Sequence, residues 1–92
     1  MSSKWYLYVV ECADGTLYTG ITTNVKRRIN EHNYSFKSAK YTRGRRPVAL
    51  AMVKEHESHS SAAKAEWRFK QLTRKQKLEK INDSKNEKPI LL

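Results

Sequence analysis

The chain has 92 residues, 38% of them hydrophobic and 10% aromatic, which is enough for one small folded domain and too short for two. Its nineteen Lys and Arg residues against nine Asp and Glu give a net charge of +10 and indicate a polyanionic partner such as a nucleic acid. The longest apolar run, residues 5–10, is too short to span a bilayer or to act as a signal peptide, and Cys12 is the single cysteine. We therefore expect a cytoplasmic protein with no membrane contact and no disulfide-linked partner, whereas a non-covalent protein partner stays open.

The start of the chain predicts a β-hairpin. Residues 5–12 are aromatic or β-branched almost throughout, as strands prefer, and residues 17–22 form the returning strand. Asp14 and Gly15 supply the turn between them.

The length of that turn decides which side chains share a face. A two-residue turn would pair Tyr8 with Ile21 and place Tyr8 and Tyr18 on opposite faces. A three-residue loop with Gly15 in the left-handed conformation pairs Tyr8 with Gly20 instead. We favour the three-residue loop, because a glycine opposite Tyr8 leaves an open concavity beside two phenols.

Three segments predict helices. Polar residues at 22–24 offer N-caps for a helix over residues 24–33, and a serine-rich stretch caps a second helix from about residue 58 to 72. Thr73 caps a short third helix that ends near Ile81.

Between the first and second helices the pattern changes twice. Residues 34–46 show neither helical nor strand periodicity and predict a loop, whereas residues 48–53 are apolar and predict a third, well-buried strand. We expect Trp5, Trp67 and Phe69 to lie in the core.

The order ββαβαα predicts a small α+β domain with a three-stranded antiparallel sheet flanked by helices. We expect residues 4–82 to form this single domain and residues 83–92 to form a flexible tail. The apolar end of that tail, residues 90–92, could instead dock on the core.

Two tripeptides, nine residues apart, carry a likeness to a known family. The sequence Tyr6-Leu7-Tyr8 and the sequence Tyr18-Thr19-Gly20 resemble the paired motifs that name the GIY-YIG nuclease superfamily. Their spacing, the Asp-Gly turn between them, and an Arg and a Glu on the two following helices make the likeness specific. It runs from about residue 4 to residue 81 and is greatest to the small stand-alone bacterial branch. Tyr6, Leu7 and Thr19 depart from the letters of the name, but all three suit a strand, so we expect the fold to be kept.

The resemblance implies hydrolysis of phosphodiester bonds in DNA, rather than RNA, with little sequence specificity and with structure selectivity left open. It implies one divalent ion, Mg²⁺ or Mn²⁺, held by Glu66, and Arg28 on the phosphate. Tyr8 is assigned as general base or water orienter and Tyr18 as its supporting partner, with their order left open. His32 lies one helical turn after Arg28 and could reach the same phosphate. Gly20 is assigned a structural role at the site.

Helical geometry agrees with the role of the arginine. At 100° per residue, Arg28 lies about 60° from the apolar stripe at Val25, whereas Arg27 lies about 160° away and faces solvent. By default Glu66 would simply pair with Lys70 four residues later.

A basic segment follows the first helix. No acidic residue lies between Glu31 and Glu55, and aromatic residues alternate with cations there, which is typical of surfaces that hold phosphates and stack on bases. The cations assigned to nucleic-acid binding are Lys37, Lys40, Arg43, Arg45 and Arg46. The same surface would also suit a binding protein without catalysis, which is the alternative function.

Overall fold

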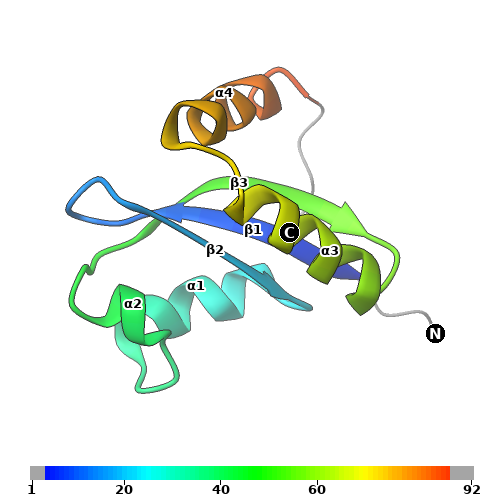
Figure 1. The fold of residues 1–92 in the computed structure, drawn as a ribbon. Coiled ribbons are helices and arrows are strands. Elements are labelled where there is room, and N and C mark those ends of the chain that lie inside the picture. Colours follow the sequence, from blue (N-terminus) through cyan, green and yellow to red (C-terminus); the bar gives the residue numbers. More distant parts are fainter. Residues whose placement is uncertain (1–3, 88–92) are drawn as a thin grey trace.

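The computed structural model describes residues 4–87, which form a three-stranded antiparallel sheet with helices on both faces (Figure 1). The strands, in the spatial order β2-β1-β3, are β1 (Trp5–Glu11), β2 (Leu17–Thr22) and β3 (Ala49–His56). The helices are α1 (Val25–Tyr34), α2 (Lys40–Arg43), α3 (His59–Lys70) and α4 (Arg74–Ser84). The predicted α+β class is confirmed, and so is the order of its elements. The short α2 is an addition within the segment predicted as a loop.

The hairpin has the three-residue loop. Gly15 has a φ of 83°, and its N–H donates to the carbonyl of Cys12 at 2.9 Å. Tyr8 pairs with Gly20 and Val10 pairs with Tyr18 across the ladder, so the predicted register is confirmed. Because pairing partners lie on the same face of a sheet, both tyrosines point to one side.

Each face of the sheet has its own small core. Leu7 and Val9 of β1 pack with Met52 of β3, Phe69 of α3 and Ile81 of α4. The opposite face packs against α1 through Ile29, and its buried residues are Tyr8, Val10, Cys12 and Val48. The central strand therefore separates a purely apolar core from one that contains a buried phenol.

Local hydrogen bonds fix where the helices begin. Asn24, Ser58 and Thr73 each accept a bond from a backbone N–H of the first turn, as their side chains predict. The amide of Asn33 pairs with both backbone groups of Val48, at 2.7 and 3.1 Å, and so fastens the end of α1 to the start of β3.

The tip of the hairpin is tied to both helical layers. Arg45, which follows α2, pairs with Asp14 at 3.0 Å. Arg74, the first residue of α4, donates to the carbonyl of Gly15, also at 3.0 Å. The turn is therefore held from above and from below the sheet.

Two expectations about burial were wrong. Trp67 is 65% exposed, because it lies five residues after the buried Ala62 and hence about 140° around the helix from it. The third strand is less buried than predicted, since β3 is an edge strand and Ala49 and Leu50 are exposed at its start. Phe69, in contrast, is buried as expected, and Trp5 is half-buried.

Part of the segment expected to be a flexible tail, residues 83–87, is described by the structure. Residues 83 and 84 form the last turn of α4, and Glu87 pairs with Lys54 of β3. Residues 88–92, including the apolar 90–92, lie outside the described residues. From residue 4 to residue 87, no helix has both the length and the apolar character needed to cross a bilayer.

Gly20 is required by close packing. A Cβ at this position would lie 2.6 Å from the hydroxyl oxygen of Tyr8, so the phenol itself occupies the concavity that we expected to be open. We expect Gly20→Ala to lower the free energy of unfolding by about 1–3 kcal/mol, as overpacking does. Gly44→Ala is the matched control, because nothing lies within 4 Å of its Cβ position. Urea denaturation of both variants measures the difference, and equal stability would contradict the packing.

Candidate active site

A chain of three buried side chains lies at the centre of the site. The Tyr8 hydroxyl is 2.7 Å from His32 Nε2, and His32 Nδ1 is 2.9 Å from the Thr42 hydroxyl. Tyr8 is 1% exposed, and His32 and Thr42 are fully buried. The chain therefore connects β1, α1 and α2 through side chains alone.

The hydrogen bond made by Thr42 determines which group donates in each of the other two hydrogen bonds. The Thr42 hydroxyl has one proton and donates it to the carbonyl of Ala39 at 3.0 Å. Thr42 must therefore accept from His32 Nδ1–H, which leaves the lone pair of Nε2 on a neutral imidazole. Tyr8 then donates its O–H to that lone pair. His32 is the acceptor for the proton of Tyr8.

Burial keeps both groups of this pair neutral. Desolvation raises the pKa of Tyr8 to about 12, although the guanidinium of Arg28 beside the hydroxyl opposes the shift. Desolvation, followed by the positive charge of Arg28, lowers the pKa of His32 to about 4. At neutral pH Tyr8 is thus a phenol and His32 an imidazole.

Arg28 is held in place beside this pair. Its Nη1 donates to Glu31 Oε1 at 3.1 Å and to the carbonyl of Lys37 at 2.6 Å. The guanidinium has five N–H groups, and those of Nε and Nη2 are left for the Tyr8 hydroxyl beside it and for a ligand. The side chain is 23% exposed, which agrees with the expectation that Arg28 points along the sheet while Arg27 is exposed.

Glu66 reaches the same site from α3. Its negative charge contributes to the raised pKa of Tyr8, and its side chain is 25% exposed. Oε2 lies 3.4 Å from Lys70 Nζ, which is the default pairing expected from the sequence. Residues 4–87 contain no cluster of three potential metal ligands. A single half-exposed carboxylate nevertheless fits Mg²⁺, which is commonly held by one or two carboxylates with waters and substrate oxygens.

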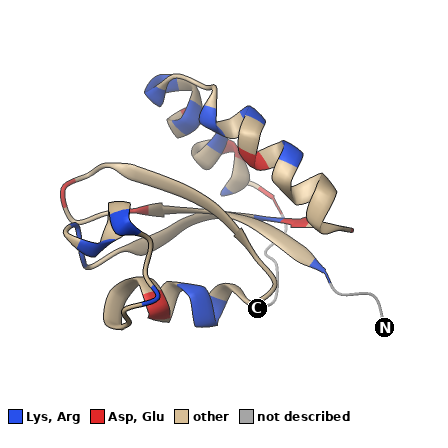
Figure 2. Cartoon of the chain, turned by 60° about the horizontal axis from the view of Figure 1, so that its bottom comes forward, with Lys and Arg blue, Asp and Glu red and all other residues tan. Residues whose placement is uncertain are grey.

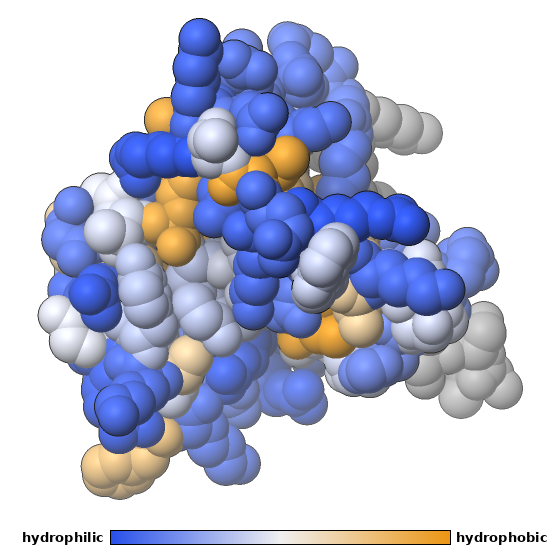
Figure 3. Space-filling model, in the orientation of Figure 1, coloured by the Kyte–Doolittle hydropathy of each residue, from blue (hydrophilic) through white to orange (hydrophobic). Residues whose placement is uncertain are grey.

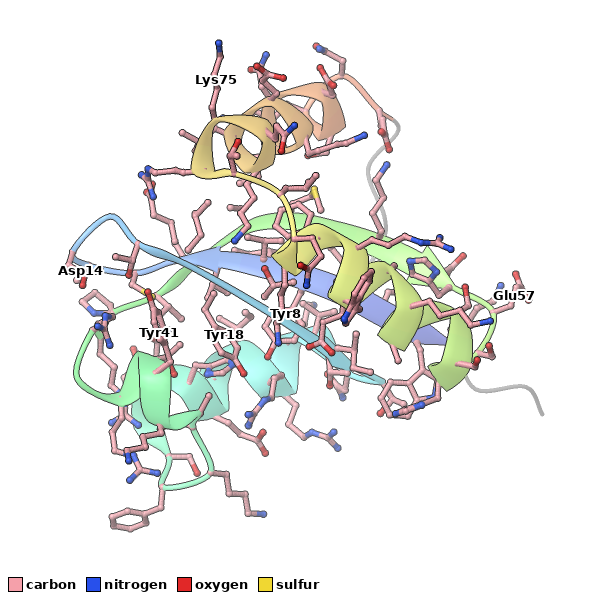
Figure 4. All side chains as sticks on the ribbon, in the orientation of Figure 1. Tyr8, Asp14, Tyr18, Tyr41, Glu57 and Lys75 are labelled. Atoms are coloured by element: carbon pink, nitrogen blue, oxygen red, sulfur yellow. The ribbon has the colours of Figure 1, made fainter. Side chains whose placement is uncertain are left out.

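Tyr18 completes the group on the solvent side of His32. Its half-buried ring meets the His32 ring edge-on at 5.3 Å and stacks on Tyr41 at 5.9 Å. Arg45 covers the Tyr41 ring at 4.1 Å. Figure 4 shows Tyr8, Tyr18 and Tyr41 together on the side of the sheet that carries α1 and α2.

The structure therefore brings together the two tyrosines, Arg28, His32 and Gly20, with Glu66 close to Tyr8. His32, which we expected to reach a phosphate, is buried with both nitrogens bonded to protein, so it lies behind Tyr8 in this arrangement. Sequence reasoning missed Thr42 and Glu31. The spacing of Glu31, three residues after Arg28, was a usable signal for the ion pair. Nothing local pointed to Thr42.

The arginines of the basic segment are largely occupied within the protein. Arg46 donates to the carbonyls of His32 and Ser35 at 2.6 Å each. Arg43 donates to the carbonyl of Phe36 at 3.2 Å. Arg45, as described, binds the hairpin tip. Lys37 and Lys40 are exposed instead, and Figure 2 shows further Lys and Arg on both helical layers.

Comparison with known proteins identifies the family of the chain. A family model described as the GIY-YIG catalytic domain matches residues 4–82. The chain belongs to the GIY-YIG family, a nuclease-type domain.

Within that family its relatives are UPF0213 proteins. One from Desulfotalea psychrophila is 56% identical over 81 residues, which cover 86% of this chain and 74% of the relative. One from Streptococcus agalactiae is 56% identical over 82 residues, which cover 89% and 92%.

Solved structures of similar chains have the same fold. The solution NMR structure of a UPF0213 protein from Bacillus halodurans is 41% identical, covers 90% of this chain and 87% of its own, and has a TM-score of 0.59. The solution NMR structure of a protein from E. faecalis is also 41% identical; the match covers 97% of this chain and 94% of that chain, with a TM-score of 0.63.

The buried His32 predicts a loss of stability in acid. The unfolded chain takes up a proton near pH 6.5, whereas folded His32 does so only near pH 4, so the free energy of unfolding falls as the pH drops through this window. The full loss attributable to His32 is about 3 kcal/mol. Urea denaturation between pH 7 and pH 4 measures it, and His32→Gln should show a correspondingly shallower dependence. An identical pH dependence in the variant would contradict a neutral buried imidazole.

Proposed function

We propose that this protein is a divalent-metal-dependent endonuclease that hydrolyses phosphodiester bonds in DNA with little sequence specificity. The observation that carries the proposal is the neutral Tyr8–His32 pair with the guanidinium of Arg28 beside it and the carboxylate of Glu66 nearby. This group combines a proton acceptor, a phosphate-binding cation and a metal-binding carboxylate, which are the parts that phosphodiester hydrolysis needs.

The proton of the attacking water would leave through Tyr8. As the phenol oxygen takes that proton, its own proton passes along the 2.7 Å hydrogen bond to His32 Nε2. His32 becomes an imidazolium whose Nδ1–H still donates to Thr42. Two neutral groups thus act together as one general base, which a phenol alone with a pKa of about 12 does poorly.

Substrate binding would strengthen this base. The positive charge of Arg28 is one cause of the lowered pKa of His32. Desolvation is the larger cause and stays in place, but a phosphate bound to Arg28 offsets the charge of the guanidinium, so the pKa of His32 rises above its value of about 4 when the substrate is present. Because Tyr8 is only 1% exposed, the attacking water would reach its hydroxyl after Arg28, which lies beside it, moves toward the bound phosphate.

Glu66 would hold the divalent ion, with waters and substrate oxygens as the other ligands. When bound, such an ion supplies polarisation of the phosphoryl oxygen and stabilisation of the departing alkoxide. Lys70 is then displaced from Glu66, which costs little, because exposed ion pairs contribute only about 0–1 kcal/mol.

A second candidate function is nucleic-acid binding without cleavage. Two observations favour it: Glu66 already pairs with Lys70, and Arg28 already pairs with Glu31. Glu66 distinguishes the two functions, since binding alone has no use for a carboxylate that repels phosphates.

We expect Glu66→Gln to abolish Mg²⁺- or Mn²⁺-dependent cleavage while DNA affinity in EDTA stays equal or increases slightly. Glu79→Gln is the matched control, because Glu79 is exposed on α4 and lies outside the site. Labelled single-stranded, duplex and branched DNA, incubated with metal or with EDTA, provide the assay. Unchanged cleavage by Glu66→Gln would refute the assignment, and absence of metal-dependent cleavage by the unmodified protein would favour the binding function.

The basic segment should act through its lysines. We expect the double variant Lys37→Gln, Lys40→Gln to bind DNA more weakly, and by a similar factor for unrelated sequences. The slope of log K for DNA binding against log salt concentration should become shallower by about 2. Arg46→Gln should instead lower the free energy of unfolding, because it removes bonds to the carbonyls of His32 and Ser35. Binding titrations over a range of salt, beside urea denaturation, separate these effects. A loss of affinity confined to one sequence would contradict a non-specific contact.

A further inference from the structure

Trp67 is exposed beside the candidate site. It follows Glu66 directly on α3 and is 65% exposed, whereas Ala62 and Phe69 form the buried side of the helix. Leaving an indole in water forfeits the free energy that its burial would give, so the position is not explained by the stability of the domain. Successive helical residues differ by 100°, which places Trp67 outward from Glu66 rather than on the opposite side of α3.

The residues around the indole suit a nucleic-acid strand. Lys64 lies three residues before Trp67 and Lys70 three residues after it, so a lysine stands on the helix surface on either side of the ring. Ala63, four residues before it, is too small to cover the indole. An open aromatic face between cations is the arrangement that holds single strands, in which bases stack on the ring and phosphates meet the lysines.

The two aromatic rings stacked beside His32 are less free to stack on a base. Tyr18 and Tyr41 already stack on each other, and Arg45 covers Tyr41. The face that carries α3 in front is predominantly hydrophilic, with apolar side chains in separated patches (Figure 3), which favours a charged partner over a broad apolar protein interface.

We propose that Trp67 stacks on an unpaired base next to the phosphate that the site would cleave. The substrate class is then a nucleic acid with unpaired bases at the cleavage point, a single strand, a flap or a loop, rather than continuous duplex. This inference rests on the proposed function, because it assumes that the phosphate lies between Arg28 and Glu66.

Tryptophan emission tests the contact without any catalysis. In a Trp5→Phe background Trp67 is the single tryptophan, and EDTA prevents metal-dependent cleavage. We expect single-stranded DNA to quench its emission and blunt duplex of the same sequence to leave it nearly unchanged. Trp67→Ala should weaken single-strand affinity at least about 5-fold, as the loss of one stacked base does, and change duplex affinity little.

Two substitutions at the same position separate stacking from other contacts. Trp67→Phe should retain most of the single-strand affinity, because it keeps an aromatic face. Trp67→Leu should behave like Trp67→Ala, because it keeps apolar area but has no face on which a base stacks. All three variants should unfold at nearly the urea concentration of the parent, since the side chain is exposed.

The outcomes are distinct from those of the nuclease test. Equal quenching by duplex, full affinity in Trp67→Ala, wild-type affinity in Trp67→Leu, or no binding of any nucleic acid would each overturn the stacking proposal. Absence of metal-dependent cleavage, with intact quenching by single strands, would refute the nuclease function and leave Trp67 as a stacking residue of a binding protein.

Discussion

The site depends on one buried hydrogen bond between a strand and a helix. The 2.7 Å contact from Tyr8 to His32 joins the central strand to α1, and Thr42 extends it to α2. A buried polar group without a partner costs roughly 1–3 kcal/mol, so the three residues have to be present together. Gly20 belongs to the same constraint, because only a residue without a Cβ lets the phenol lie across β2. The packing of α1 and α2 on the sheet and the proposed proton transfer therefore depend on the same side chains.

The positive charge of the chain has two different uses. Arg43, Arg45 and Arg46 hold the segment around α2 in shape by donating to carbonyl and carboxylate oxygens. Arginine is suited to this, because its planar group can satisfy several acceptors at once. Exposed lysines such as Lys37 and Lys40 carry their charge into solvent instead. A net charge of +10 consequently overstates the number of cations that are available to a polyanion.

Much of this arrangement could be predicted from the sequence, for physical reasons. The Asp-Gly pair restricts the hairpin to a few turn types, and the turn type decides whether Tyr8 and Tyr18 lie on the same face of the sheet. The helix starts are predictable at Asn24, Ser58 and Thr73, because their short polar side chains accept hydrogen bonds from backbone N–H groups of the first turn.

The remainder depends on contacts between distant residues. That His32 would be buried follows from Thr42, ten residues away, and from a short helix that has no apolar period of its own. The exposure of Trp67 follows from its angle on the helix, which residue type alone does not predict. Composition does not tell which charges meet carbonyl oxygens inside the fold, as those of Arg43 and Arg46 do.

The turn at Asp14 and Gly15 has a mechanical consequence. Arg45 binds the carboxylate of Asp14 from one side of the sheet, and Arg74 binds the carbonyl of Gly15 from the other side. The two arginines belong to helical layers that the strands separate. The two helical layers therefore share an anchoring point at the end of the sheet, in addition to their packing on its two faces. A ligand that bound the guanidinium of Arg45 would release only the contact with Asp14, and the bond from Arg74 to the carbonyl of Gly15 would still hold the turn to α4.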